Sequence, residues 1–304
     1  MMSKAFVPNT AIRRFAEVLM PSEAEAPILS RPIRAAVHQW RVELGSVKEL
    51  QAVGLKPRRS ALLFGPPGCG KTTLAHHLAA RLGLPLVVVN MASLTSCYLG
   101  ETGKNINALF DAVIEQADSC VLFLDEFDSV CSKRRAAESS AGQERNAIVI
   151  ALLQKIDQFP GTMLAATNRA DDVDPAIWRR FGLHLDIVEP DDECRQAILV
   201  RYLQPYSLSP AGLKELCNAT AGASPALLRQ LMEGLKRDMV ISPKLSSQKQ
   251  PMDLSAAGVF ARVLASVRPH SDTQQPPLWT VDDALKRVES ITWPPTLPSA
   301  GGEG

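Results

Sequence analysis

Residues 65–72 have the types and spacing of a loop that binds phosphate groups. They read Gly-Pro-Pro-Gly-Cys-Gly-Lys-Thr, between an apolar run at 61–64 and a helix-like stretch at 73–82. Glycines let the backbone fold around an anion, and the first amides of the helix point at it. We expect Lys71 to contact the β and γ phosphates of a nucleoside triphosphate and the Thr72 hydroxyl to bind Mg2+. The alternative is an ordinary glycine–proline turn.

Two carboxylates after a second apolar run predict what happens to the nucleotide. Residues 121–124 read Val-Leu-Phe-Leu, and Asp125 and Glu126 follow directly. A buried parallel strand would deliver both at its carboxyl end, where such sheets bind ligands. We expect Asp125 to hold Mg2+ and Glu126 to orient the attacking water, because displacement at the γ phosphate needs a positioned base. A surface acidic turn is the alternative, and Asp128 is expected to be structural.

The predicted nucleotide site is a defined set of residues. Those expected to bind the nucleotide are Gly65, Pro66, Pro67, Gly68, Cys69, Gly70, Lys71, Thr72, Thr73 and Asp125. Among them, Thr72 and Asp125 are the expected metal ligands.

A third strand completes a pattern that resembles a known family. The run at 162–166 ends just before Thr-Asn-Arg at 167–169. With the two motifs above, it is similar to the AAA subfamily of AAA+ ATPases, and the resemblance covers residues 55–240. It implies ATP hydrolysis with Mg2+ and places Asn168 at the sensor-1 position, where a polar group contacts the γ phosphate or the lytic water. Alone, such an asparagine indicates only the cap of a strand end.

A later segment resembles the one that carries arginine fingers in this family. Residues 174–181 read Asp-Pro-Ala-Ile-Trp-Arg-Arg-Phe, similar to the katanin, spastin and ESCRT-disassembly branch. That branch usually has three arginines before the phenylalanine, and here Trp178 stands at the first of these positions. The resemblance implies that Arg179, with Arg180 second, reaches the nucleotide of a neighbouring subunit and stabilises charge on its γ phosphate. Alternatively, both are surface residues at a helix end.

Between the two nucleotide motifs lies a short segment that resembles a pore loop. Tyr98, Leu99 and Gly100 follow the strand predicted at 86–90. In AAA unfoldases, an aromatic, an aliphatic and a glycine residue at this place line a central pore and grip a polypeptide, so the resemblance implies that role here. Burial of Tyr98 at the edge of the sheet is the alternative. Residues 133–143 are expected to form a second loop facing the channel, or a solvated linker.

The elements that must position these residues alternate between strands and helices. This alternation predicts an α/β fold, with the parallel sheet of a P-loop NTPase flanked by helices and followed by a small helical lid. The predicted domains are a helical N-terminal segment at 1–54, the nucleotide-binding α/β domain at 55–188, the helical lid at 189–240, and a linker with helices and a disordered tail at 241–304.

Two further segments lead to weaker expectations. The N-terminal segment is predicted to be amphipathic, and its apolar face to pack on the ATPase core or, alternatively, to bind a partner. The residues of this face are Ile12, Phe15, Ala16 and Leu19. In the lid, the turn at 222–226 departs from the family pattern, which leaves Arg229 as a weak substitute for the sensor-2 arginine.

Composition narrows the classes of function. The chain has 304 residues, 46% of them hydrophobic and 21% charged, enough for one α/β core and one helical lid. A formal net charge of +1 gives no case for general nucleic-acid binding. The six cysteines show no paired C-x-x-C spacing, which predicts free thiols in a reducing compartment. We expect a cytoplasmic protein without a membrane span or signal peptide.

Taken with the resemblance, these features predict an ATP-hydrolysing homo-oligomeric ring, a hexamer, that remodels, unfolds or disassembles a protein substrate by threading it through a central pore. One alternative is a nucleotide-dependent regulatory subunit of a partner effector or protease. Another is an ATPase of the clamp-loader or helicase-loader type that acts on nucleic acid. Such a protein is expected to have a basic pore and a sensor-2 arginine that matches the family position better than Arg229.

Overall fold

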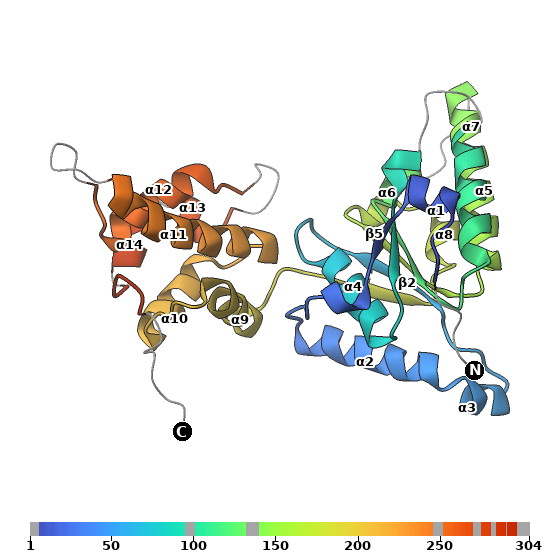
Figure 1. Ribbon diagram of the computed structural model, residues 1–304, viewed down its shortest axis with the longest axis horizontal. Helices are drawn as coiled ribbons and strands as arrows, with labels where there is room; N and C mark the ends of the chain where they lie inside the picture. Colours follow the sequence, from blue (N-terminus) through green and yellow to red (C-terminus); the bar gives the residue numbers. More distant parts are fainter. Residues whose placement is uncertain are drawn as a thin grey trace. The chain divides into compact units, whose positions relative to one another are not determined.

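The structure is a computed structural model that describes residues 6–94, 101–131, 140–245, 252–269, 275–280, 284–289 and 291–296. The chain divides into two compact units (Figure 1). The first contains the N-terminal residues up to Pro27 together with Arg31–Val188, and the second contains Ile28–Ser30 and the chain from Glu189 onward.

A six-stranded sheet forms the centre of the first unit. Its strands are β1 Glu17–Leu19, β2 Ser60–Phe64, β3 Leu86–Asn90, β4 Val121–Asp125, β5 Thr162–Thr167 and β6 Leu183–Asp186. Their spatial order is β1-β3-β4-β5-β2-β6, and every neighbouring pair is parallel except β1 with β3. Because parallel strands end at one edge of a sheet, the residues that follow β2, β4 and β5 meet there.

Helices flank this sheet (Figure 1). They are α1 Thr10–Phe15, α2 Arg31–Gly45, α3 Val47–Ala52, α4 Lys71–Arg81, α5 Glu101–Ile114, α6 Asp128–Cys131, α7 Ser140–Gln158 and α8 Pro175–Trp178, with 3-10 helices η1 Pro21–Glu23, η2 Met91–Leu94 and η3 Ala170–Asp172. The mostly parallel sheet flanked by helices confirms the predicted fold of a P-loop NTPase.

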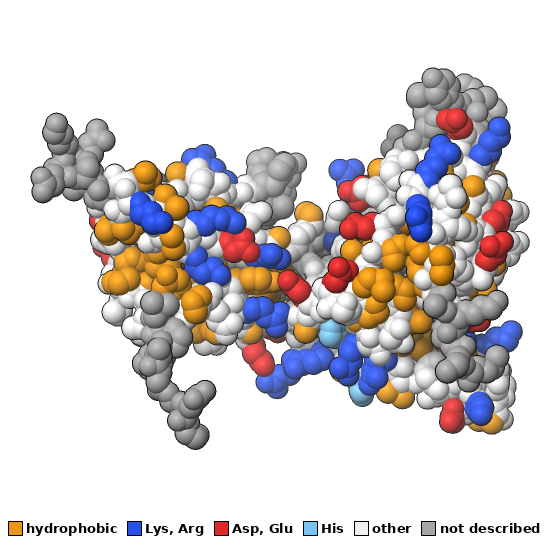
Figure 2. All heavy atoms as spheres, in the orientation of Figure 1, with side chains coloured by type: hydrophobic (Ala, Val, Ile, Leu, Met, Phe, Trp, Pro, Cys, Tyr) orange, Lys and Arg blue, Asp and Glu red, His pale blue; other side chains and the backbone are white. Residues whose placement is uncertain are grey.

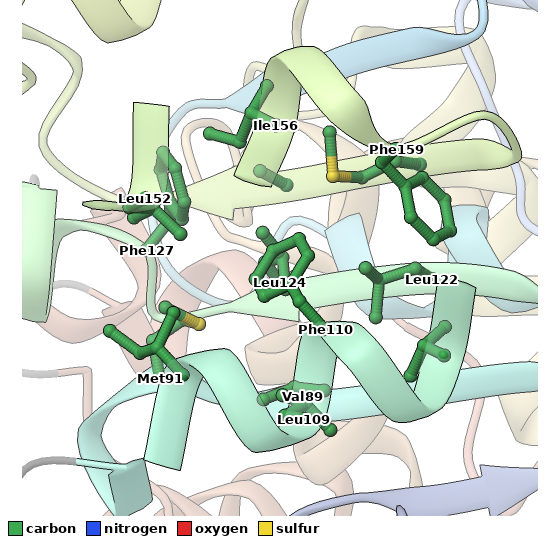
Figure 3. Close-up of a cluster of buried hydrophobic side chains, with 14 of the residues drawn as sticks. Val89, Met91, Leu109, Phe110, Leu122, Leu124, Phe127, Leu152, Ile156 and Phe159 are labelled. Atoms are coloured by element: carbon green, nitrogen blue, oxygen red, sulfur yellow. The ribbon is translucent and has the colours of Figure 1, made fainter. Parts of the chain in front are cut away.

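The main core of this unit contains alternate residues of the strands and one face each of α5 and α7 (Figure 3). Leu122 and Leu124 of β4 meet Phe110 of α5 and Leu152 of α7 in this cluster, and all four side chains are buried. Phe123 between them is buried as well and points to the other face, where α4 packs. Burial on both faces explains why the β4 segment is continuously apolar.

The N-terminal segment contributes an edge strand that the sequence did not predict. Ile12 is fully buried in the main core, so the segment packs on the α/β unit as expected. The helix ends at Phe15, however, and β1 pairs antiparallel with β3, with Leu19 opposite Leu86. Leu19 is therefore a strand residue and does not share a helix face with Ile12. Three residues are too few for a period-2 pattern to reveal a strand.

The second unit consists of helices around a separate core. They are α9 Asp192–Leu203, α10 Pro210–Ala219, α11 Pro225–Leu245, α12 Ala256–Ser266, α13 Pro277–Thr280 and α14 Ala284–Glu289. Leu231 of α11 and Phe260 of α12 lie in this core and are fully buried. Because α12 and α14 also contribute to it, the compact unit continues beyond residue 240.

The surface charge and the length of the helices indicate whether nucleic acid or a membrane is a possible partner. On the described part of the face shown in Figure 2, acidic and basic side chains both occur on the first unit, in line with the net charge of +1. That face therefore lacks the uniform positive charge that favours nucleic acid. Among the described residues, no helix has both the length and the apolar character needed to cross a bilayer.

Candidate nucleotide site

The predicted phosphate loop connects β2 with α4 and ends at the N-terminus of that helix. Gly70 is the N-cap of α4 and has a φ of 88°, a left-handed conformation that favours glycine. Gly65 has a φ of 137°, and a Cβ atom there would lie 2.2 Å from the carbonyl oxygen of Ile187. Glycine is thus required at position 65 and favoured at position 70. The loop and the helix N-terminus form a backbone cradle of the kind that binds phosphate.

Lys71 lies against this loop and is largely buried. Its Nζ donates hydrogen bonds to the carbonyl oxygens of Gly65, at 2.7 Å, and Pro66, at 2.8 Å. Burial lowers the pKa of Lys71 from its ordinary value, and the carboxylates of Asp125 and Asp128 act in the opposite direction. A phosphate group in the loop would give this desolvated ammonium a charged acceptor in place of the carbonyls.

Thr72 and Asp125 are brought together from positions 53 residues apart. The Thr72 hydroxyl donates to Oδ2 of Asp125 at 3.0 Å. Thr72 stands in the first turn of α4, and Asp125 is the last residue of β4. Hydroxyl and carboxylate oxygens are the hard donors that Mg2+ prefers, so this pair fits the predicted metal. When bound, Mg2+ would neutralise charge on the phosphates.

Glu126 has the backbone geometry of a functional position. Its φ of 51° makes it the one non-glycine residue with a positive φ among those the structure describes. The turn is held by its amide, which donates to Oδ1 of Asp125 at 2.9 Å. A left-handed conformation costs about 1–2 kcal/mol for a residue with a side chain, and such strain is concentrated at active sites. The Glu126 residue is exposed and stands directly beside the predicted metal ligand.

Asp128 joins the end of β4 to the end of β5. Its Oδ1 accepts hydrogen bonds from the Thr167 hydroxyl, at 2.9 Å, and from the amide of Asn168, at 3.4 Å. The amide of Phe127 donates to the carbonyl oxygen of Ala166 at 2.9 Å. These bonds hold the backbone of the predicted sensor residue beside the Glu126 turn. The sequence offered one signal for this link, an acid two residues after Glu126, but did not identify Thr167.

The two candidate finger arginines have different surroundings. Arg180 donates through Nε to Oδ2 of Asp157 at 2.9 Å, in an exposed ion pair. Arg179 is the C-cap of α8 and is exposed. In the portion of the chain that the structure describes, its side chain forms no hydrogen bond or ion pair. Arg179 is therefore available for a contact outside its own chain, whereas Arg180 would first have to leave Asp157.

Three other predicted features are the pore segment, the second loop and the sensor-2 candidate. Tyr98, Leu99 and Gly100 lie outside the described residues, as do residues 133–139 of the predicted second loop. Arg229, the weak candidate for sensor 2, belongs to the helical unit. There its Nε donates to Oε1 of Glu233 at 2.8 Å, and its guanidinium lies 5.2 Å from the ring centroid of Tyr202.

Comparison with known proteins agrees with this geometry. Residues 61–188 match the family described as "ATPase family associated with various cellular activities (AAA)". The uncharacterised AAA family ATPase y4kL of Sinorhizobium fredii is 42% identical over 185 residues, which are 56% of this chain and 54% of that protein. A proteasome-activating nucleotidase of Pyrococcus horikoshii is 34% identical over 187 residues, 60% of this chain and 47% of that protein.

The similarity to spastins reaches further along the chain. Spastin of Drosophila simulans is 31% identical over 271 residues, 86% of this chain and 33% of that protein, which supports the resemblance to the katanin and spastin branch. The chain thus spans between a third and about half the length of these relatives. The matched segment 61–188 contains the phosphate loop, Asp125 and Glu126 at the end of β4, and the arginines after α8. Residues 61–188 are therefore an AAA ATPase domain.

Proposed function

We propose that this chain hydrolyses ATP with Mg2+ as its cofactor. The observation that carries the proposal is the hydrogen bond between Thr72 and Asp125, at 3.0 Å, with the exposed Glu126 next in the chain. It joins the phosphate loop to the acidic end of β4, so that one site contains residues for the phosphates, the metal and the water. The match of residues 61–188 to the AAA family supports the same activity.

Each residue has a distinct part in the proposed reaction. The loop amides and Lys71 would bind the phosphates, and Thr72 with Asp125 would hold the metal. Glu126 orients water for in-line attack on the γ phosphorus, which needs positioning and electrostatic stabilisation but no covalent intermediate. Asn168 is held close by through the Asp128 bonds and would contact the γ phosphate or the water.

Two substitutions separate nucleotide binding from turnover. Lys71→Ala should abolish ATP binding, because the phosphates lose their ammonium partner. Glu126→Gln should preserve binding and reduce turnover by about a hundredfold or more, because it removes only the base that positions water. Binding is measured by calorimetry and turnover by phosphate release. Glu115→Gln, a change in an exposed glutamate outside the site, is the control. Equal turnover in Glu126→Gln and the unmodified protein would contradict the mechanism.

We further propose that the active form is a homo-oligomeric ring, a hexamer, in which Arg179 acts on the neighbouring subunit's nucleotide. Support comes from the exposure of Arg179 and from the resemblance of its segment to the katanin and spastin branch. Mixed rings test this directly. Arg179→Ala subunits have an intact pocket, Glu126→Gln subunits have an intact finger, and neither hydrolyses ATP alone. Mixing them should restore part of the turnover, and no recovery in verified mixed rings would contradict action between subunits.

The proposed work of the ring is to remodel or unfold a protein by threading it through the central pore. The support is the position of Tyr98, Leu99 and Gly100 between β3 and α5, together with the family resemblance. Tyr98→Ala should leave basal hydrolysis within a few-fold of the unmodified protein and remove most remodelling, since an aromatic contact contributes about 1 kcal/mol at each gripping position. Leu84→Ala, outside this segment, is the control. Unchanged remodelling would exclude a gripping role for Tyr98.

A second candidate function follows from one of the relatives. The Pyrococcus protein is named for proteasome activation, which favours a nucleotide-dependent regulatory subunit of a partner protease. In the threading ring, delivery of a folded substrate to such a protease needs Tyr98 and Glu126. In a regulatory subunit, ATP binding alone activates the protease. Stimulated cleavage of a short unstructured peptide by Glu126→Gln with ATP, and equally by Tyr98→Ala, would favour the regulatory function.

A further inference from the structure

Trp178 stands at a position where the katanin, spastin and ESCRT-disassembly branch usually has an arginine. The structure shows which residues its indole ring contacts. Its ring stacks on His184 of β6, with centroids 4.4 Å apart and planes 14° apart. The Nε2–H of His184 also donates to the Trp178 carbonyl oxygen at 2.9 Å. The side chain and the backbone of Trp178 are therefore held by one residue of the sheet.

Trp178 also contacts the strand that leads into the phosphate loop. The ring of Phe64, the last residue of β2, lies 5.2 Å from the indole with an angle of 56° between the planes. Phe64 directly precedes Gly65, and Trp178 directly precedes Arg179. One aromatic contact thus links a residue beside the phosphate loop to a residue beside the candidate finger.

A second aromatic contact holds the other end of the same segment. Phe181 is buried and meets Phe127 edge to face, with centroids 5.7 Å apart and an angle of 89°. Phe127 is the neighbour of Glu126 in the chain. The backbone between the two anchors is fixed by Ser60, whose hydroxyl donates to the carbonyl oxygen of Arg180 at 3.1 Å. The two arginines are therefore carried by a short segment with an aromatic anchor at each end.

The anchors leave the two arginine side chains in different states. Arg180 is paired with Asp157, and Arg179 is exposed at the end of α8. Since α8 has only four residues, its own hydrogen bonds give little rigidity to its C-terminal end. The direction in which Arg179 leaves the surface therefore depends on how Trp178 is held. Aromatic stacking of this kind is enough to favour one orientation by about twofold to about tenfold.

We propose that Trp178 is a positioning residue, whose stacking on His184 and tilted ring contact with Phe64 set the orientation in which Arg179 reaches the nucleotide of a neighbouring subunit. The inference rests on the proposed action of Arg179 between subunits. It assigns to the tryptophan the alignment of the remaining finger, at a place where the branch it resembles usually has another arginine.

Mixed rings can localise this role to one side of the interface. The reference mixture combines Glu126→Gln subunits, which donate the finger, with Arg179→Ala subunits, which provide the pocket. Trp178→Ala is then introduced into the donor alone or into the pocket subunit alone. We expect about a tenfold loss of recovered turnover when the change is in the donor, and less than about a twofold change when it is in the pocket subunit. A structural defect alone would not distinguish the two sides.

Two further variants keep the test independent of folding. Trp178→Phe in the donor retains a stacking ring and should restore turnover to within about twofold of the reference mixture. Trp279→Ala removes a half-buried tryptophan of the helical unit and, in the donor, should not change the recovery. The recovered turnover of the different donor mixtures is compared at equal concentrations of assembled rings, measured by mass photometry. All measurements are made below the unfolding temperature of each donor.

The outcomes are distinguishable. No recovery in the reference mixture refutes action between subunits, and this inference with it. Recovery in the reference mixture that persists unchanged with a Trp178→Ala donor refutes only the positioning role. A loss confined to the pocket subunit would mean that Trp178 acts on its own phosphate loop through Phe64, and would also overturn the inference.

Discussion

Glu126 combines a proposed role in catalysis with backbone strain. Its left-handed φ of 51° turns the chain at the end of β4. Glycine would adopt this conformation without strain, but it has no carboxylate to position water. The residue type is thus explained by the proposed reaction and not by the stability of the turn.

This conflict predicts different stabilities for two inactive variants. Glu126→Gly and Glu126→Ala both remove the carboxylate, but alanine keeps the strained φ and glycine relieves it. We expect Glu126→Gly to be more stable than Glu126→Ala by about 1 kcal/mol, measured by urea unfolding, with turnover lost in both. An Ala variant as stable as the Gly variant would show that the turn is not strained.

Asp128 allows a second prediction about an individual side chain. Its carboxylate accepts from Thr167 and from the amide of Asn168, and so holds the end of β5 beside the Glu126 turn. Asp128→Ala should reduce turnover about tenfold or more while ATP affinity stays within about threefold, because the loss of charge-assisted hydrogen bonds affects alignment of the sensor. Thr167→Val removes one of these donors and should have a smaller effect. Turnover unaffected by Asp128→Ala would contradict the positioning role.

The helices of the second unit are joined by a charged pair with a predictable pH dependence. Nε and Nη2 of Arg262 on α12 donate to the two carboxylate oxygens of Asp238 on α11, at 2.9 and 2.7 Å. These bonds lower the pKa of Asp238 from its ordinary value of 3.8, and partial burial opposes the shift. The stabilisation is therefore fully present above 3.8 and is lost as the pH falls through the lowered pKa.

Asp238→Asn tests this pair. Near neutral pH we expect it to destabilise the helical unit by about 1–2 kcal/mol, a value that allows for the partial exposure of both groups. The difference from the unmodified protein should shrink when the pH falls well below the ordinary range of aspartate. Denaturant midpoints at both pH values measure it, with Glu215→Gln, an exposed carboxylate of α10, as the control. A difference that is independent of pH would indicate lost packing instead of a lost charge pair.

Two separate hydrophobic cores imply that the chain unfolds in two steps. Leu124 is fully buried in the core of the first unit and Leu231 in that of the second. Replacing either by alanine should destabilise its own unit by about 2–5 kcal/mol and leave the other transition in place. Calorimetry of the two variants measures both transitions. If either variant shifted both transitions equally, the units would unfold as one.

Local patterns were sufficient for much of the fold and of the nucleotide site. Apolar runs identified β2, β3, β4 and β5, because buried parallel strands are apolar on both faces. Gly65 and Gly70 were recognisable because their conformations exclude or disfavour other residues. The strand β1 could not be recognised, because three residues show no period and its pairing depends on the free edge of β3.

The proposed chemistry of the nucleotide site could be inferred from the order of residues, because each motif is a short stretch of consecutive residues. Contacts between distant segments could not be inferred in this way. The bonds of Asp128 to the end of β5, the pairing of Arg180 with Asp157, and the contacts of Trp178 with Phe64 and of Phe181 with Phe127 join positions 23 to 114 residues apart. Such contacts depend on which strands become neighbours, and that order is established only when the sheet packs around a common core.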